Sequence, residues 1–365
     1  MRRPHPIAWT FAALLAAGVT GAPDAAPDAP PTATPFRHVV VVSVDGLRPD
    51  AIDGPEDGPL PGFGRMRKGP HTLQARSDAT LTITLPNHVS MITGRPVNGR
   101  TGHGWTLNDD PPAAKDGGTL HVRRGAYVAS MFDVAHDRGA ATAVIATKSK
   151  FSLMAQSYDD DHGAADRDGA DDGKDKVDAF ACLRTSRMAR ETAVAWLRSR
   201  QGQGQSLTLL HFAAPDHAGH GTGWDMSPAS PYRKAVAEVD AELAALLAAI
   251  DADPALRGTV AVILTADHGG GVPFISHTVP VAKENFLIPF LVWLGADRAP
   301  SELAALNADR RALAPATEYL GDDASPPPIR NADAGNLALQ LLGMPAIAGS
   351  VANARQDLLL EEPAP

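Results

Sequence analysis

Residues 39–46 read Val-Val-Val-Val-Ser-Val-Asp-Gly, and this stretch decides the fold class of the chain. Residues 39–44 are apolar except at Ser43, and a run that is apolar on both faces is typical of a strand covered on both sides by helices. Four similar runs follow, at 143–146, 207–212, 260–264 and 286–293. Because helical patterns separate these runs, we expect an α/β fold, a three-layer sandwich whose central, mostly parallel sheet is covered by helices.

The segments between the strands predict helices and loops. Apolar residues at 236, 239, 243, 246 and 250 follow the three-to-four spacing of an amphipathic helix. The segments 180–200 and 336–342 also indicate helices, and Gly343 and Pro345 end the second of them. The segment 159–178 carries nine Asp with few apolar residues, so we expect a solvated loop there.

The beginning of the chain predicts export. Residues 1–22 have the composition of a signal peptide, with Arg2 and Arg3 before an apolar run and small residues after it. Residues 23–36 are rich in Ala and Pro, which is typical of a flexible spacer, and residues 37–365 are expected to form a single domain. No later stretch is long and apolar enough for a membrane span. We therefore expect a periplasmic or secreted protein.

The charge of the chain limits its partners. A formal net charge of −9 argues against a nucleic-acid duplex, because binding to a phosphate backbone requires a surplus of Lys and Arg. A small anionic substrate remains compatible with this charge, because bound metal ions can outweigh the global field over a few Å. The sequence leaves the oligomeric state open.

Acidic residues follow three of the predicted strands at the point where each strand ends. Asp45 follows the first strand directly, Asp216 follows the strand at 207–212, and Asp267 follows the strand at 260–264. A single Asp in such a place is often only a helix cap. Because the carboxyl ends of neighbouring parallel strands meet at one edge of a sheet, we expect these three carboxylates to converge.

Histidines accompany two of these carboxylates. Asp216 and His220 are four residues apart, which places them on one face of a helical turn. Asp267 is followed by His268 and three glycines, which allow the backbone to approach an ion closely. Mixed Asp and His ligands suit zinc and similar divalent ions, and the sequence supplies enough of them for two ions.

With these motifs the chain resembles the alkaline phosphatase superfamily, and within it the type I phosphodiesterase/nucleotide pyrophosphatase-like branch. The resemblance covers residues 39 to about 349. It rests on matching motifs in the family's order: Val44-Asp45-Gly46-Leu47-Arg48, Thr84-Leu85-Pro86-Asn87-His88, Thr93-Gly94, Pro215-Asp216 with Gly219-His220, and Asp267-His268-Gly269. It implies that residues 37–365 form one alkaline-phosphatase-like catalytic domain.

The resemblance also implies the members of the site. Asp45, Thr84, Asp267 and His268 are expected to hold one divalent ion, and Thr84 is expected to be the nucleophile. The second ion is expected at Asp216 and His220 with a further His after Gly269, where His277 is the remaining histidine. In the nucleotide pyrophosphatases this last His lies much further downstream, so the short spacing is more similar to other branches.

Four further residues are weaker candidates. Asn108 follows a His-Gly pair, as does the family's Asn that donates to a phosphoryl oxygen, and this role is favoured over the alternative of a simple turn. Lys148 and Lys150 follow a predicted strand and are similar to a basic pair that holds a phosphate oxygen in some monoesterases. The alternative for both is a solvated loop. Trp105 is a candidate for stacking against a leaving group, or for core packing.

These residues suit phosphoryl transfer. Two divalent ions, expected to be Zn²⁺, would lower the pKa of the threonine hydroxyl and neutralise the leaving oxygen of a small phosphorylated substrate. The expected activity is hydrolysis of phosphodiesters or nucleotide pyrophosphates through a phosphothreonine intermediate. The alternatives are a phosphomonoesterase and, from another class, a metal-binding or carbohydrate-recognition protein without turnover. Sulfatase chemistry is not expected, because residues 84–88 lack the Cys/Ser-x-Pro-x-Arg pattern.

Overall fold

A computed structural model describes residues 36–54, 58–296 and 298–362. The predicted signal peptide and all but the last residue of the predicted spacer lie outside these described residues. Within the described part of the chain, no helix is both long enough and apolar enough to cross a membrane.

The core of the structure is one eight-stranded sheet. Five neighbouring strands in the order β4-β3-β5-β1-β6 are mutually parallel, β7 is antiparallel to both of its neighbours, and β2 and β8 complete the edge. The prediction of a mostly parallel sheet is therefore confirmed. The strands are β1 (His38–Val44), β2 (Pro70–Arg76), β3 (Ala141–Ala146), β4 (Ala179–Cys182), β5 (Ser206–Phe212), β6 (Val260–Thr265), β7 (Leu287–Trp293) and β8 (Ser301–Glu302).

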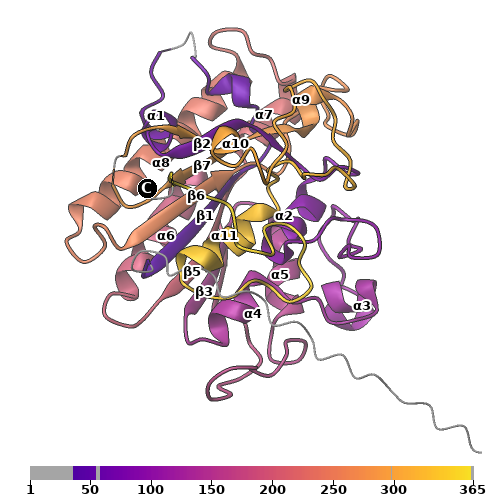
Figure 1. The fold of residues 1–365 in the computed structure, drawn as a ribbon, viewed down its shortest axis with the longest axis vertical. Coiled ribbons are helices and arrows are strands. Elements are labelled where there is room, and N and C mark those ends of the chain that lie inside the picture. Colours follow the sequence, from indigo (N-terminus) through magenta and orange to yellow (C-terminus); the bar gives the residue numbers. More distant parts are fainter. Residues whose placement is uncertain (1–35, 55–57, 297, 363–365) are drawn as a thin grey trace, which may run out of the picture. The chain divides into compact units, whose positions relative to one another are not determined.

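Helices cover both faces of this sheet. Along β1, β5 and β6 every residue is buried, so side chains pointing to either face meet a covering layer. One layer contains α2 (Thr84–Thr93), α4 (Met131–His136) and α11 (Asp333–Leu341), and α11 lies in front of the sheet in Figure 1. The other contains α1 (Pro61–Met66), α6 (Ser186–Ser199), α7 (Ala214–Thr222) and α8 (Pro231–Ala252). This arrangement is the predicted three-layer sandwich.

The remaining helices are short and lie in the connections. They are α3 (Leu120–Arg124), α5 (Ser152–Ser157), α9 (Lys283–Phe286) and α10 (Leu303–Leu306), with single 3-10 turns at Pro49–Ala51, Ala114–Asp116 and Ser149–Phe151.

The expected single helix at 180–200 is wrong. The first residues of this segment form β4, which pairs with β3 in parallel, and α6 begins only at Ser186. Thr185 divides the two elements, because its backbone is extended and its hydroxyl accepts a hydrogen bond from Met188 N at 3.2 Å, which caps the helix.

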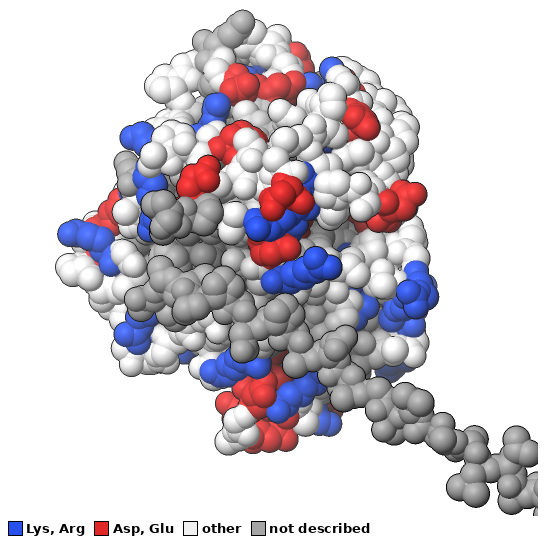
Figure 2. All heavy atoms as spheres, viewed as in Figure 1, with Lys and Arg blue, Asp and Glu red and all other residues white. Residues whose placement is uncertain are grey.

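The register of the sheet brings the ends of its central strands together. Val44 of β1 lies beside Phe212 of β5, and Ser43 lies beside Thr265 of β6. The residues that leave these strands therefore enter one region at the carboxyl edge of the sheet. On the face seen in Figure 2, acidic and basic side chains lie in small mixed groups.

Candidate metal centre and active site

The carboxyl edge of the sheet forms one wall of a cleft of about 450 Å³. Neighbouring strands β3, β5, β1 and β6 are followed in that order by Lys148, Asp216, Asp45 and Asp267, so three adjacent strands deliver carboxylates and the fourth delivers a lysine to one place. The cleft is lined by Thr84, Asn108, Thr147, Lys148, Ser149, Lys150, Asp216, His217 and His220.

Four of the predicted ligands form a first cluster around His268. Its Nε2 lies 3.5 Å from Asp45 Oδ1, 3.2 Å from Asp267 Oδ2 and 3.3 Å from Thr84 Oγ1. Asp45, Asp267 and His268 are fully buried, and Thr84 is 1% exposed. The cluster therefore combines two carboxylates, an imidazole and a hydroxyl out of contact with bulk water.

The other three predicted ligands form a second cluster. His220 Nε2 lies 3.4 Å from Asp216 Oδ1 and 3.2 Å from His277 Nε2, and His277 Nε2 lies 3.8 Å from Asp216 Oδ1. The rings of His268 and His277 stack at 3.6 Å between centroids, so the two clusters are adjacent.

Hydrogen bonds fix how the three imidazoles face these clusters. The Nδ1 atoms of His220, His268 and His277 donate to the carbonyl oxygens of Ile275, Gly269 and Thr82, respectively. In the neutral ring this leaves Nε2 unprotonated, with its lone pair directed into the cluster. Burial lowers the pKa of His268 and His277, which keeps both rings neutral. A backbone partner on the outer nitrogen is typical of histidines that bind metal.

The carboxylates of the two clusters also have features expected of metal ligands. Asp45 Oδ1, Asp216 Oδ1 and Asp267 Oδ2 are buried and accept no hydrogen bond from the described residues. Burial and the nearby Asp45 raise the pKa of Asp267 well above its usual range. Buried oxygens without donors are costly unless a cation binds them, so the residues of both clusters fit divalent ions.

A lysine already lies between the two clusters. Lys148 Nζ is 2.6 Å from Asp45 Oδ2 and 2.6 Å from Asp216 Oδ2. Burial would lower its pKa, but these two carboxylates outweigh burial and raise it. Lys150 also lines the cleft, and its Nζ has no carboxylate partner within ion-pair distance among the described residues.

The start of α2 positions the predicted nucleophile. Thr84 is the first residue of the helix, where the backbone N–H groups and the helix dipole favour negative charge. Asn108 Oδ1 accepts a hydrogen bond from Leu85 N at 3.0 Å, which leaves the Nδ2 group as the donor. Asn108 and the predicted nucleophile Thr84 both line the cleft, so this donor belongs to the same cleft.

Sequence reasoning missed two residues of the site. His211 lies near the end of β5, and its Nε2 donates to Asp45 Oδ2 at 3.1 Å. A histidine within a fully buried, mainly apolar strand was a usable signal for it. Trp224 carries no such signal in the sequence, yet its indole N–H donates to Gly46 O at 2.9 Å, next to Asp45.

The stacking role suggested for Trp105 is wrong. Its ring is fully buried and its Nε1 donates to Leu107 O at 3.0 Å. The ring is part of the core, so it has no face to offer to a leaving group.

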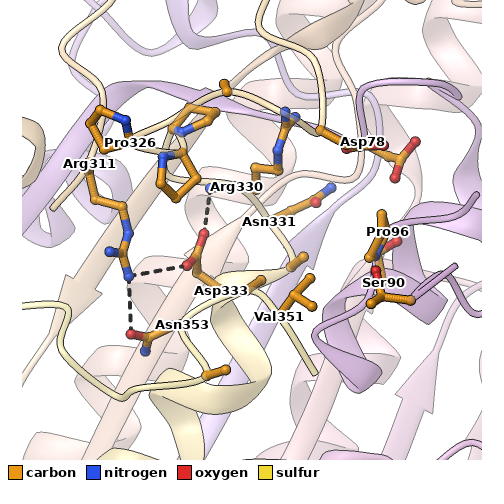
Figure 3. A pocket seen from close by; sticks show the side chains of 18 of the residues that line it. Asp78, Ser90, Pro96, Arg311, Pro326, Arg330, Asn331, Asp333, Val351 and Asn353 are labelled. Atoms are coloured by element: carbon orange, nitrogen blue, oxygen red, sulfur yellow. Dashed lines mark hydrogen bonds and ion pairs between the residues drawn. The ribbon is translucent and has the colours of Figure 1, made fainter. Parts of the chain in front are cut away.

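A larger cavity, of about 900 Å³, lies outside the predicted site (Figure 3). The close-up shows Arg311 bonded to Asp333 and Asn353, while Asp333 also accepts a bond from Arg330 N. The larger cavity is connected to the predicted site through Asn331, whose Nδ2 donates to the backbone carbonyls of Ala266 and Asp267. None of the predicted site residues lines this cavity, so we assign the chemistry to the smaller cleft.

Comparison with known proteins identifies the family of the chain. A family model described as type I phosphodiesterase / nucleotide pyrophosphatase matches residues 39–272. No curated protein sequence matches the chain.

Solved structures share the fold. A protein of the alkaline phosphatase superfamily from Vibrio parahaemolyticus is 15% identical with a TM-score of 0.57, over 89% of this chain and 71% of that one. A 2-O GAG sulfatase, BT1596, is 13% identical with a TM-score of 0.56, over 90% of this chain and 76% of the other. Murine ectonucleotide pyrophosphatase / phosphodiesterase 5 is 24% identical over 63% and 57% of the two chains, with a TM-score of 0.41. The first two of these similarities confirm the predicted alkaline-phosphatase-like fold.

Proposed function

Because the chain belongs to the type I phosphodiesterase / nucleotide pyrophosphatase family, a hydrolase family of the alkaline phosphatase superfamily, we propose that it hydrolyses phosphodiesters or nucleotide pyrophosphates. One observation carries the proposal. Three buried carboxylate oxygens that lack a donor among the described residues and three imidazole lone pairs converge on the region beside the Thr84 hydroxyl.

The two clusters define the ion sites that we propose. Asp45, Asp267, His268 and Thr84 would hold one divalent ion, and Asp216, His220 and His277 would hold the other. The mixture of carboxylate oxygen and imidazole nitrogen suits zinc. When bound, such ions would lower the pKa of the Thr84 hydroxyl and neutralise charge on the leaving oxygen.

The chain's own residues account for the remaining steps. Thr84 Oγ attacks phosphorus, so a Thr84–phosphate bond forms as the bond to the leaving oxygen breaks. Asn108 Nδ2 would donate to an equatorial phosphoryl oxygen, where negative charge accumulates. Water then releases the phosphoryl group from the phosphothreonine. Two inversions give net retention of configuration at phosphorus.

A phosphomonoesterase is the second candidate, and Lys150 is the observation that favours it. A cation that lines the cleft and has no carboxylate partner in the described part of the chain can bind the additional negative charge of a monoester. We expect Lys150→Met to lower kcat/KM for an aryl phosphomonoester more than for the matching diester. Equal losses on both esters would remove this candidate.

The central test uses full-length protein, stripped with a strong chelator and reloaded with zinc. Turnover of an aryl phosphodiester, an aryl phosphomonoester and an aryl sulfate is compared, and the sulfate is expected to be the poorest substrate. Chelation should abolish turnover, zinc should restore it, and Thr84→Ala should lower kcat by at least about 10³-fold. Unchanged turnover after chelation, or in Thr84→Ala, would overturn the proposal.

We also propose that the enzyme is periplasmic or secreted. The support is the sequence of residues 1–22, with its basic start, apolar run and small residues. Expression of the full chain in a bacterial host, followed by separation of periplasm from cytoplasm, tests this. Uncleaved enzyme that remained in the cytoplasm would contradict it.

A further inference from the structure

Two large apolar side chains lie exposed next to the second cluster. Phe274 is 69% exposed and its neighbour Ile275 is 51% exposed. They belong to the segment 272–276, which joins the Asp267-His268 pair to His277. Single exposed apolar residues are ordinary on protein surfaces. Two adjacent ones in the segment between candidate ligands call for a specific explanation.

Contacts place both residues at the side of His220. Ile275 O accepts the hydrogen bond from His220 Nδ1 at 2.9 Å. The Phe274 ring packs on Gly223, where an added Cβ would lie only 2.5 Å from Phe274 Cζ. Gly223 directly follows α7, the helix that carries Asp216 and His220. The tip of the Phe274 ring is therefore held against the end of α7, while most of the side chain is open.

The segment that presents these side chains is fixed by hydrogen bonds. Ser276 N donates to Pro273 O at 2.7 Å, and Gly271 N donates to Ser276 O at 2.9 Å. Val272 N donates to Asn285 Oδ1 at 3.2 Å, and the Asn285 amide donates back to Val272 O. These hydrogen bonds therefore hold the turn that carries Phe274 and Ile275 in one conformation. A surface that selects between substrates needs such a fixed conformation.

The direction of the reaction indicates what this surface contacts. Thr84 lies in the first cluster, 3.3 Å from His268. In an in-line displacement the leaving oxygen departs on the side opposite the nucleophile, which is the side of His220 and His277. We propose that Phe274 and Ile275 form the leaving-group subsite and select esters whose leaving group is flat and apolar, such as an aryl alcohol. This inference rests on the proposed function.

The test compares phenyl and 2-naphthyl esters of the same phosphate, whose leaving groups have similar acidity but differ in apolar area. Zinc-loaded wild type should favour the naphthyl ester in kcat/KM, and Phe274→Ser should lower that preference about three- to tenfold. Phe274→Leu, which keeps an apolar side chain, should retain part of it. Leu313→Ser, at another exposed apolar position, is the matched control and should leave the preference unchanged.

The outcomes separate this inference from the proposed function. If zinc-loaded wild type hydrolyses neither ester, the proposed function itself fails. If both esters are hydrolysed and Phe274→Ser has the wild-type preference, the proposed function stands and the leaving-group subsite is refuted. Since Phe274 is mostly exposed, its substitution should not impair folding, and an unchanged unfolding midpoint confirms that the comparison is valid.

Discussion

The oxygen and the nitrogen of the Asn108 side-chain amide have different roles. Its Oδ1 anchors the first turn of α2 through Leu85 N, and its Nδ2 is the donor that we assign to the phosphoryl group. Asn108→Asp keeps an acceptor for Leu85 N but replaces the donor by a second acceptor. We expect kcat to fall by about 10²–10³-fold, the usual effect of losing one donor to a developing charge, while the unfolding midpoint changes little.

Asn108→Ala provides the comparison for this residue. It removes the anchor as well as the donor, so both kcat and the unfolding midpoint should fall. Steady-state kinetics and thermal unfolding of the two variants measure these effects. An Asn108→Asp enzyme with wild-type kcat would show that Asn108 is only the turn that its sequence also allows.

His103 is a buried neutral histidine that makes stability depend on pH. Its Nδ1 accepts from Trp105 N, and its Nε2 lies 3.1 Å from Ser90 Oγ. Burial lowers the pKa of His103 from 6.5 to about 3. Below pH 6.5 the unfolded chain binds a proton that the folded protein does not bind, so the free energy of unfolding decreases as the pH falls from 6.5 towards 3.

This loss can be measured against a variant without the imidazole. The free energy of unfolding should be lower at pH 5 than at pH 7 by roughly 2 kcal/mol, because each pH unit below 6.5 lowers it by about 1.4 kcal/mol. In His103→Gln, denaturant unfolding should show a pH dependence that is weaker by this amount. Parallel pH profiles of the two proteins between pH 7 and 5 would contradict the assignment.

Among the elements, the connection after α7 holds the motifs of the site together. The Trp224 ring lies close to two glycines, and an added Cβ would come within 2.4 Å of it at Gly219 and within 2.1 Å at Gly270. Gly219 belongs to the segment with Asp216 and His220, and Gly270 follows His268. With its bond to Gly46 O, the indole contacts the segments that carry all three site carboxylates.

Two glycines of α7 test this packing. Gly219→Ala must displace the Trp224 ring, so we expect a loss of about 1–3 kcal/mol in unfolding free energy and weaker zinc binding. Gly221→Ala lies in the same helix with nothing within 4 Å of the added Cβ, so it should be neutral or gain up to about 1 kcal/mol. Denaturant unfolding and zinc titration of both variants measure the difference, and equal behaviour would refute the packing role.

The same elements show what could be predicted from the sequence. Apolar runs defined the central strands, because a strand buried on both faces has a local signature, and the positions of Asp45, Asp216 and Asp267 after them followed from parallel topology. The division of 180–200 and the contacts of Trp224 depend on which elements become neighbours. Neither β4 pairing nor an indole packed on two distant glycines has a local pattern, so both required the structure.

At the scale of the whole molecule, the site concentrates buried negative charge at the centre of the sheet. Asp45, Asp216 and Asp267 are at most 1% exposed, and the Lys148 cation pairs with two of them, Asp45 and Asp216. The Lys148 cation holds the pKa of Asp45 well below its usual range, against the opposing effect of burial. Stability of the fold is therefore coupled to whatever positive charge the site holds.

Lys148→Met tests this coupling. In chelator, the variant leaves two buried carboxylates without their cation, and we expect a loss of about 3–5 kcal/mol in unfolding free energy. With saturating zinc, bound ions supply the missing charge, so the loss should shrink to about 1 kcal/mol or less, and zinc should raise the midpoint of the variant more than that of wild type. Thermal unfolding of both proteins with chelator and with zinc gives the four midpoints needed.

Ser149→Ala, next to Lys148 in the cleft, is the matched control and should respond to zinc as wild type does. A Lys148→Met penalty of the same size in both conditions would mean that the lysine stabilises the fold independently of any ion.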